Sequence, residues 1–294
     1  MKISIAATTD IGKERSNNED TFLICPELSL QNWSQNDTSS YIQLDKYGSV
    51  LIFADGMGGP QAGEVASSIA IESIQHYFTP DKYENAIISG NFNEVLSASI
   101  KNADDAINRK ILDDPDTSGM GTTIVVCWII DKAAHIAWCG DSRCYVYNPI
   151  SGLKLLTKDH SLVQELIDKG EITEKEAFTH PNNNVITKGL GDFDTRPVPD
   201  IVTYKIKTND TLLLCSDGLS GYCTNAEIEK VLNTNYKDIK KCRDELLKLA
   251  LNAGGYDNIC IGLASLIGNE QSAPQKPPFI NKLHYKLKSF WRCR

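Results

Sequence analysis

The segment Val50–Gly59 constrains this chain more than any other part of its sequence. It opens with five apolar residues, several of them β-branched or aromatic, which is typical of a buried strand. The strand is expected to end at Asp55, and the glycine after it lets the backbone carbonyl of Gly56 approach an ion beside the carboxylate. Apolar residues then recur at helical spacing from Ala66 to Phe78. The alternative is an ordinary turn in which Asp55 only hydrogen-bonds its own backbone.

Three more aspartates repeat this pattern. Asp141 and Asp217 follow apolar strands and lie next to glycine, and Asp257 directly precedes a strand. For Asp141 the alternative is a tight hairpin whose turn the carboxylate caps. Carboxylates without His or Cys partners select Mg²⁺ or Mn²⁺ rather than Zn²⁺. Acids that converge in a cleft repel one another, so they require cations.

The polar segment between the first two expected strands, residues 10–20, contains one arginine among several acids. Arg15 is either part of a surface ion pair or a bidentate phosphate clamp beside a metal site. Two cations about 3.5–4 Å apart can hold a water, lower its pKa and direct it at phosphorus. Together with Arg15, such a site suits the hydrolysis of phosphate esters.

The remaining pattern predicts alternating strands and helices. Strands are expected over residues 2–9, 22–24, 124–130, 134–139 (resuming at 145–147), 211–215 and 259–263, and further helices over 93–111 and 238–252. Residues 159–191 are polar for their length and are expected to form a flap with a short amphipathic helix. His160 and His180, which lie in this flap, are interpreted as structural hydrogen-bonding groups rather than metal ligands.

The composition of the chain argues against several classes of protein. The 294 residues carry a formal net charge of −8, which argues against a general nucleic-acid binder. The nine cysteines contain no C-x-x-C pair, so neither a disulfide framework nor a zinc site is expected, and the pattern suits a reducing compartment. The first residues do not resemble a signal peptide, and no apolar run reaches about 18 residues. A cytoplasmic protein is therefore expected.

The C-terminal end differs from the rest of the chain. A catalytic domain is expected over residues 1–267, followed over 268–294 by a Pro-containing linker and a tail in which Lys and Arg alternate with apolar and aromatic residues. Such a tail suits weak contact with an anionic membrane surface or an acidic partner protein. A disordered end, or a tail folded back on the acidic body, is the alternative.

Seven short motifs occur in an order that identifies a family. They are Arg15 with Asn18-Glu19-Asp20, Asp55-Gly56-Met57-Gly58-Gly59, Gly121-Thr122-Thr123, Gly140-Asp141-Ser142-Arg143, Asp159-His160-Ser161, Ser216-Asp217-Gly218 and Asp257-Asn258. Over residues 3–265 the chain resembles the metal-dependent type 2C protein Ser/Thr phosphatases in their bacterial form. Each motif alone is weak, whereas the ordered set is highly specific.

The resemblance implies an α+β fold, a four-layer α-β-β-α sandwich of two antiparallel sheets flanked by helices, with the metal site at one end. By motif, Asp55 resembles the acid that bridges two core ions, Mn²⁺ or Mg²⁺, with help from the Gly56 carbonyl. Asp217 and Asp257 resemble ligands of one ion, and Asp141 resembles the acid that holds a third ion together with Asp217. In the polar segment of residues 10–20, the resemblance implies that Glu19 and Asp20 support the ions through water and that Arg15 binds phosphate.

The position two residues after the bridging acid departs from the animal members of the family. They carry a histidine there, proposed as the general acid, whereas this chain has Met57. A thioether cannot donate a proton, so the leaving group must be protonated by metal-bound water or by another side chain.

The sequence thus predicts a monomeric phosphatase that hydrolyses phosphoserine and phosphothreonine in proteins, including a cognate Ser/Thr kinase. The water bound between the two ions is expected to attack phosphorus directly. A catalytically weak phosphoprotein-binding regulatory module of the same fold is the rival from another class. A hydrolase of small phosphate esters is a third possibility.

Overall fold

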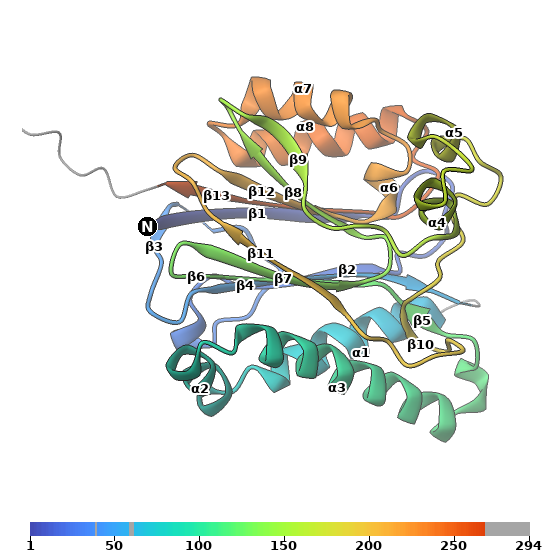
Figure 1. Cartoon of the computed structure of the whole chain (residues 1–294), viewed down its shortest axis with the longest axis horizontal. Coiled ribbons are helices and arrows are strands. Elements are labelled where there is room, and N and C mark those ends of the chain that lie inside the picture. The colour runs from blue at the N-terminus through green and yellow to red at the C-terminus, as the bar shows by residue number, and fades with distance from the viewer. Residues whose placement is uncertain (39, 59–61, 268–294) are drawn as a thin grey trace, which may run out of the picture.

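The computed structural model, which describes residues 1–38, 40–58 and 62–267, has two antiparallel sheets stacked face to face (Figure 1). The six-stranded sheet has the order β3 (Ile42–Gln43), β1 (Lys2–Asp10), β13 (Ile259–Ile267), β12 (Thr211–Cys215), β8 (Arg143–Asn148) and β9 (Gly152–Leu155). The seven-stranded sheet has the order β10 (Leu190–Gly191), β5 (Gly121–Thr122), β4 (Ser49–Met57), β6 (Ile124–Ile130), β7 (Ala133–Cys139) and β11 (Asp200–Lys205), and β2 (Asp20–Cys25) pairs with β4.

Helices cover the outer face of each sheet (Figure 1). The seven-stranded sheet is covered by α1 (Ala62–Tyr77), α2 (Pro80–Ser89) and α3 (Phe92–Asp113). The six-stranded sheet is covered by α6 (Asp217–Ser220), α7 (Asn225–Asn235) and α8 (Ile239–Asn252). The short helices α4 (Leu162–Asp168) and α5 (Glu174–Phe178) lie at one end of the sandwich, and the 3₁₀ turns Leu28–Leu30 and Pro115–Thr117 complete the elements. These four layers confirm the predicted fold class.

Three apolar layers hold the sandwich together, one between the sheets and one under each set of helices. All seven residues of β6 are buried, because this central strand faces helices on one side and the other sheet on the opposite side. Phe22 and Phe53 stack between the sheets with ring centroids 5.5 Å apart. A strand covered on both faces has a continuous apolar sequence, which explains why the sequence predicts β6 so clearly.

Most predicted elements are present. Each expected strand and both further helices lie within a few residues of the predicted bounds, and α4 and α5 lie in the expected flap. Three helices, α2, α6 and α7, were not predicted from the sequence. All three are short and bury only two or three residues each, so none has a strong apolar period.

Two local predictions are wrong. The strand that contains Asp55 continues to Met57 instead of ending at the carboxylate. Residues 134–139 and 145–147 are neither one interrupted strand nor a hairpin, because β7 and β8 belong to different sheets. Tyr145 and Tyr147 pack under the helices of the six-stranded sheet, and their burial there favours the pairing of β8 with that sheet. Asp141 therefore lies where the chain crosses between the sheets.

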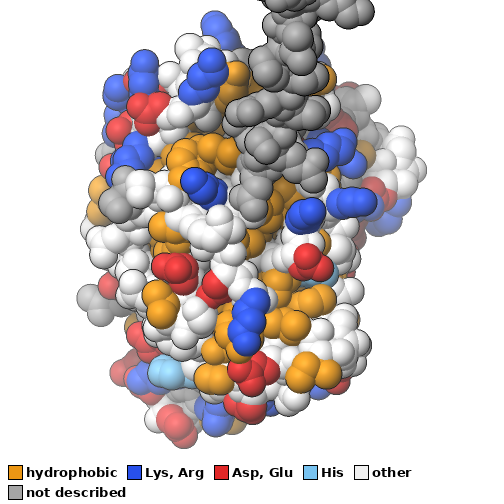
Figure 2. Space-filling model, turned by 90° about the vertical axis from the view of Figure 1, so that its left-hand side faces the viewer, with side chains coloured by type: hydrophobic (Ala, Val, Ile, Leu, Met, Phe, Trp, Pro, Cys, Tyr) orange, Lys and Arg blue, Asp and Glu red, His pale blue; other side chains and the backbone are white. Residues whose placement is uncertain are grey.

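The two ends of the sandwich differ. The end at which the N-terminus lies faces the viewer in Figure 2, where hydrophobic side chains occupy the middle and charges of both signs are scattered. The opposite end carries β5, α6 and the flap helices (Figure 1). None of the described helices combines the length and apolar character that crossing a membrane requires. The predicted linker and tail lie outside the described residues.

The packing between the sheets predicts a specific cost for one substitution. A Cβ on Gly262 of β13 would lie 2.1 Å from Cζ of Phe53 in the opposite sheet. We expect Gly262→Ala to lower the free energy of unfolding by about 1–3 kcal/mol, because overpacking displaces the ring. Chemical denaturation measures this loss. In a Phe53→Leu background the loss should shrink, and an equal loss in both backgrounds would rule out the ring contact as its cause.

Candidate metal centre

Five aspartates meet at the end of the sandwich that carries β5 and α6 (Figure 1). Antiparallel pairing of β2 with β4 places Asp20 directly opposite Asp55. The six-stranded sheet contributes Asp217, the first residue of α6 after β12, and Asp257, which comes just before β13. Asp141 enters from the crossing between β7 and β8. Acids from distant parts of the sequence thus converge as predicted.

The backbone around Asp55 is fixed by two threonines. Thr122 Oγ1 and the Thr123 amide each donate a hydrogen bond to the Asp55 carbonyl at 2.8 Å. Thr123 Oγ1 accepts the Asp55 amide at 3.2 Å and lies 2.8 Å from Ser142 Oγ, next to Asp141. The motif Gly121-Thr122-Thr123 therefore connects the strand of Asp55 to the crossing that carries Asp141. It positions the acids without contributing a carboxylate.

A serine holds Asp20. Ser216 Oγ donates to Asp20 Oδ2 at 2.6 Å and accepts the Cys260 amide at 2.9 Å. The other oxygen of Asp20, Oδ1, is buried, as is Oδ1 of Asp141, and within the described residues neither has a hydrogen-bond partner. A buried carboxylate oxygen without a partner is costly unless a cation or water satisfies it.

The electrostatics of the centre favour a bound cation. Burial, followed by the charges of neighbouring aspartates, raises the pKa of Asp55 and of Asp141 well above the ordinary value. Burial likewise raises the pKa of Asp20 to about 8 and that of Asp217 to about 6. Divalent cations would remove the repulsion that the clustered carboxylates otherwise relieve by protonation.

The carboxylates of the centre suit Mg²⁺ or Mn²⁺, which keep some bound water, better than a metal ion that is coordinated by protein side chains alone. Among the described residues, no three His, Cys, Asp or Glu side chains stand as a ready-made chelating group. Mg²⁺ keeps several waters and binds through one or two carboxylates, so an open cluster of acids is sufficient. The centre fits cations coordinated partly by protein oxygens and partly by water.

Arg15 lies at the rim of the centre. Its Nη2 atom contacts Asp257 Oδ2 at 2.8 Å, and half of its side chain is exposed. The carboxylate of Glu19, on the same loop, accepts a hydrogen bond from the Gly63 backbone near the start of α1. The structure thus brings Arg15 next to one predicted ligand, while Glu19 is turned toward α1.

Asn258 ties this loop to the rest of the centre. Its Nδ2 atom donates to the carbonyls of Ile11 and Asn17, each at 2.9 Å, and its Oδ1 atom accepts the Glu19 amide at 2.8 Å. One buried side chain therefore fixes both ends of the segment that carries Arg15. The sequence showed Asn258 beside Asp257, but not the contacts that give it this role.

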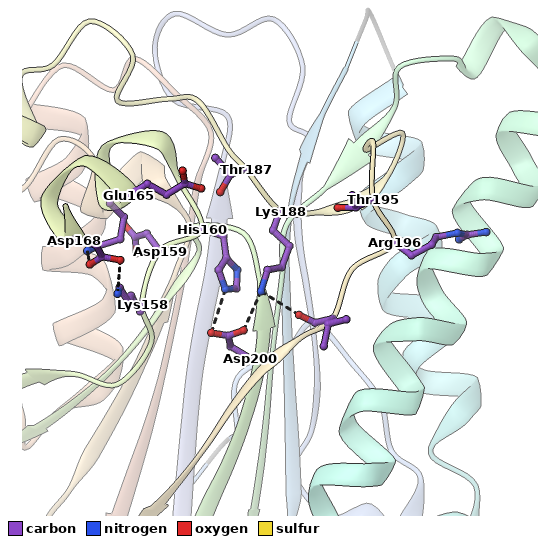
Figure 3. Close-up of a pocket in the computed structure, with 12 residues that line it drawn as sticks. Lys158, Asp159, His160, Glu165, Asp168, Thr187, Lys188, Thr195, Arg196 and Asp200 are labelled. Carbon is purple, nitrogen blue, oxygen red and sulfur yellow. Dashed lines mark hydrogen bonds and ion pairs between the residues drawn. The ribbon is translucent and has the colours of Figure 1, made fainter.

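The predicted flap borders a separate pocket of about 440 Å³ (Figure 3). His160 and Lys188 both point at Asp200 in this pocket, and His160 Nδ1 accepts the Gly140 amide at 3.0 Å. His180 Nδ1 accepts the Asn182 amide at 3.1 Å. Both histidines accept backbone hydrogen bonds, in keeping with the structural role predicted for them.

Comparison with known proteins agrees with this geometry. The sequence model described as protein phosphatase 2C matches residues 9–259. This chain belongs to the protein phosphatase 2C family. The protein phosphatase PhpP of Streptococcus pneumoniae is 33% identical over 276 residues, which are 92% of this chain and 100% of PhpP.

Solved structures of family members share the fold. The Ser/Thr phosphatase Stp1 from Staphylococcus aureus superposes with a TM-score of 0.74 at 33% identity, covering 90% of this chain and 95% of Stp1. The catalytic domain of the Ser/Thr protein phosphatase PstP, in complex with two manganese ions, gives a TM-score of 0.72 at 29% identity, covering 91% of this chain and 99% of PstP. The recognition from motifs and the predicted sandwich are confirmed.

The raised pKa values predict how stability depends on pH in this phosphatase 2C member. Between the ordinary aspartate pKa of about 3.9 and the raised values, the folded state binds more protons than the unfolded state, so stability falls as pH rises. We expect the metal-free protein to unfold at a lower temperature at pH 8 than at pH 6. Added Mn²⁺ should raise the unfolding temperature more at pH 8, because cations compete with protons for the carboxylates.

Thermal unfolding in EDTA and in Mn²⁺ across this pH range measures both effects. Asp20→Asn keeps an oxygen that can accept the Ser216 hydrogen bond but removes the charge, so its metal-free stability should depend less on pH. If wild type in EDTA gained stability relative to this variant as the pH rose, the sign assigned to Asp20 would be wrong.

The contacts of Asn258 generate a second prediction for this site. We expect Asn258→Ala to lower the free energy of unfolding by about 1–3 kcal/mol, because backbone groups of the loop lose their hydrogen-bond partners. Amide hydrogen exchange over residues 11–19 should also become faster. Asn148→Ala is the matched control, since this buried asparagine also donates two hydrogen bonds, to Thr208 O and Asp210 Oδ1. Faster loop exchange in the control as well would show that general destabilisation is the cause.

Proposed function

We propose that this chain is a protein Ser/Thr phosphatase that uses two Mn²⁺ or Mg²⁺ ions, held by its cluster of aspartates, to hydrolyse phosphoserine and phosphothreonine. The observation that carries the proposal is the convergence of Asp20, Asp55, Asp141, Asp217 and Asp257 at one end of the sandwich, where two buried carboxylate oxygens have no hydrogen-bond partner within the described part of the chain. When bound, the ions supply an activated water and stabilise charge on the phosphoryl oxygens.

The residues of the chain divide this work. Asp55 and the Gly56 carbonyl would help to hold both ions, and Asp217 and Asp257 would hold one of them. Asp141, together with Asp217, provides a place for a third ion. Glu19 and Asp20 would support the ions through bound water. These assignments rest on the motif matches, on the pairing of Asp20 opposite Asp55 and on the effect of the other aspartates on the Asp55 carboxyl.

Arg15 binds the phosphoryl oxygens of the substrate. A guanidinium forms bidentate hydrogen bonds with phosphate oxygens, and half of the Arg15 side chain is open to solvent. Its carboxylate partner, Asp257, is itself a proposed metal ligand, so a bound ion and Arg15 compete for the same oxygen atoms. That competition leaves the guanidinium available to substrate.

Met57 does not protonate the leaving alkoxide. It pairs with Gly121 in the register of β4 with β5, next to the proposed metal ligand Gly56, and a thioether has no acidic proton. The proton therefore comes from another group, such as a water held near Asp141.

The proposed substrates are phosphoproteins, among them a cognate Ser/Thr kinase, with the catalytic domain over residues 1–267 acting as a monomer in the cytoplasm. The eight cysteines among the described residues are all free and buried, which suits a reducing compartment. Nothing favours the rival binding module, because each acid that the motifs require is present.

The deciding experiment measures Mn²⁺-dependent release of phosphate from a phosphothreonine peptide, before and after chelation. Asp55→Asn and Asp217→Asn should each reduce turnover more than tenfold, equivalent to about 1.4 kcal/mol in the barrier. The same variants should weaken Mn²⁺ binding measured by titration calorimetry. Loss of Mn²⁺ binding with unchanged turnover would refute the metal-dependent mechanism.

A buried acid outside the centre is the matched control. Asp104 is 1% exposed and pairs with Arg196, one of the residues that line the flap pocket. Asp104→Asn should lower stability while keeping the Mn²⁺ dependence. If it removed Mn²⁺ binding as completely as Asp55→Asn, the aspartate cluster could not be the site of the ions.

A further inference from the structure

Two exposed tyrosines lie side by side next to the metal centre. Tyr222 and Tyr256 have ring centroids 5.5 Å apart and are 37% and 54% exposed. Tyr256 immediately precedes Asp257, and Tyr222 follows α6, the helix that begins with Asp217. The charges of Asp217, Asp257 and Arg15 all act on the Tyr222 hydroxyl, in keeping with its place just after α6.

The backbone beneath Tyr256 is shaped to hold its ring. Gly254 has φ +133°, and a Cβ there would lie 2.0 Å from Cε2 of Tyr256, so the ring lies over bare backbone. The next residue, Gly255, accepts the Lys13 amide at 2.7 Å, which connects this turn to the loop of Arg15. The position of the ring is therefore linked to the position of the guanidinium.

Exposed aromatic faces of this kind attract cations. A tyrosine ring binds an arginine or lysine side chain through its π face, with about 0.5–2 kcal/mol gained at exposed to partly desolvated sites. The chain carries a net charge of −8, which favours approach of a basic segment. Tyrosine also provides a large contact area at a low cost in conformational entropy.

We propose that Tyr222 and Tyr256 form a docking surface for a basic side chain of the substrate protein, close in sequence to the phosphorylated residue. This inference rests on the proposed phosphatase function and deepens it, because it names a substrate feature that the surface selects. The phosphoryl group binds at Arg15 and the ions, while the neighbouring Arg or Lys of the substrate lies on the two rings.

The test compares three phosphothreonine peptides that differ only in the residues flanking phosphothreonine, which are Arg, Leu or Gly. We expect kcat/KM in Mn²⁺ to be about fivefold higher for the Arg peptide than for the Gly peptide, mainly through a lower KM. In Tyr222→Ala/Tyr256→Ala this preference should disappear. In Tyr222→Phe/Tyr256→Phe it should remain, because the rings are kept.

A distant tyrosine controls for the loss of exposed aromatic surface. Tyr41 is 36% exposed and lies beside β3, at the other end of the sandwich from the metal centre (Figure 1). Tyr41→Ala should keep the preference for the Arg peptide. Survival of the preference in the double alanine variant, or a Leu peptide that is hydrolysed as well as the Arg peptide, would overturn the proposal.

A small substrate separates this proposal from the one on which it rests. If neither para-nitrophenyl phosphate nor any of the peptides is hydrolysed in Mn²⁺, the proposed function fails. If all three peptides are hydrolysed equally well, the function stands and only the docking surface is refuted. The docking surface is supported when the alanine variant loses more kcat/KM on the Arg peptide than on para-nitrophenyl phosphate.

Discussion

The structure depends on keeping several carboxylates buried and close together. Asp20 and Asp55 face each other across a strand pair, and burial, together with the charges of neighbouring aspartates, raises the pKa of both. Such an arrangement is unfavourable without cations, so the surrounding chain must hold it in place. Ser216 and the two threonines Thr122 and Thr123 do this through hydrogen bonds rather than through charge. The clustered carboxylates lower the stability of the metal-free fold, but the site is already assembled before the ions bind.

The acids come from both sheets, which makes the packing between the sheets part of the site. Asp20 and Asp55 belong to the seven-stranded sheet, whereas Asp217 and Asp257 adjoin strands of the six-stranded sheet. An ion held by acids of both sheets would link them, and sliding of one sheet over the other would separate its proposed ligands. The close contact of Phe53 with Gly262 lies between the same sheets. Core packing and metal binding therefore act on one geometric variable, the relative position of the sheets.

The sequence predicts the parts of this arrangement that depend on local pattern. Buried strands such as β6 and the aspartates at strand ends are recognisable because each has a short-range signal. The hydrogen bonds that position the acids have no such signal. Ser216 reaches Asp20 across 196 residues, and Asn258 reaches Glu19 across 239. The crossing at Asp141 was mispredicted for the same reason, since the choice of sheet for β8 depends on where Tyr145 and Tyr147 are buried.

The residues proposed to hold the ions are less exposed than the residues proposed to bind the substrate protein. Asp20 and Asp141 are buried, whereas Arg15 and the two tyrosines lie at the rim, where a protein substrate would first make contact. An exposed ion pair such as Arg15 with Asp257 contributes little to stability, so exchanging the carboxylate for a phosphoryl group costs little. The turn that carries Tyr256 is bonded through Gly255 to the loop of Arg15. A basic residue on the rings and a phosphate on the guanidinium would thus bind to two parts of one connected surface, and binding of either would favour the arrangement that binds the other.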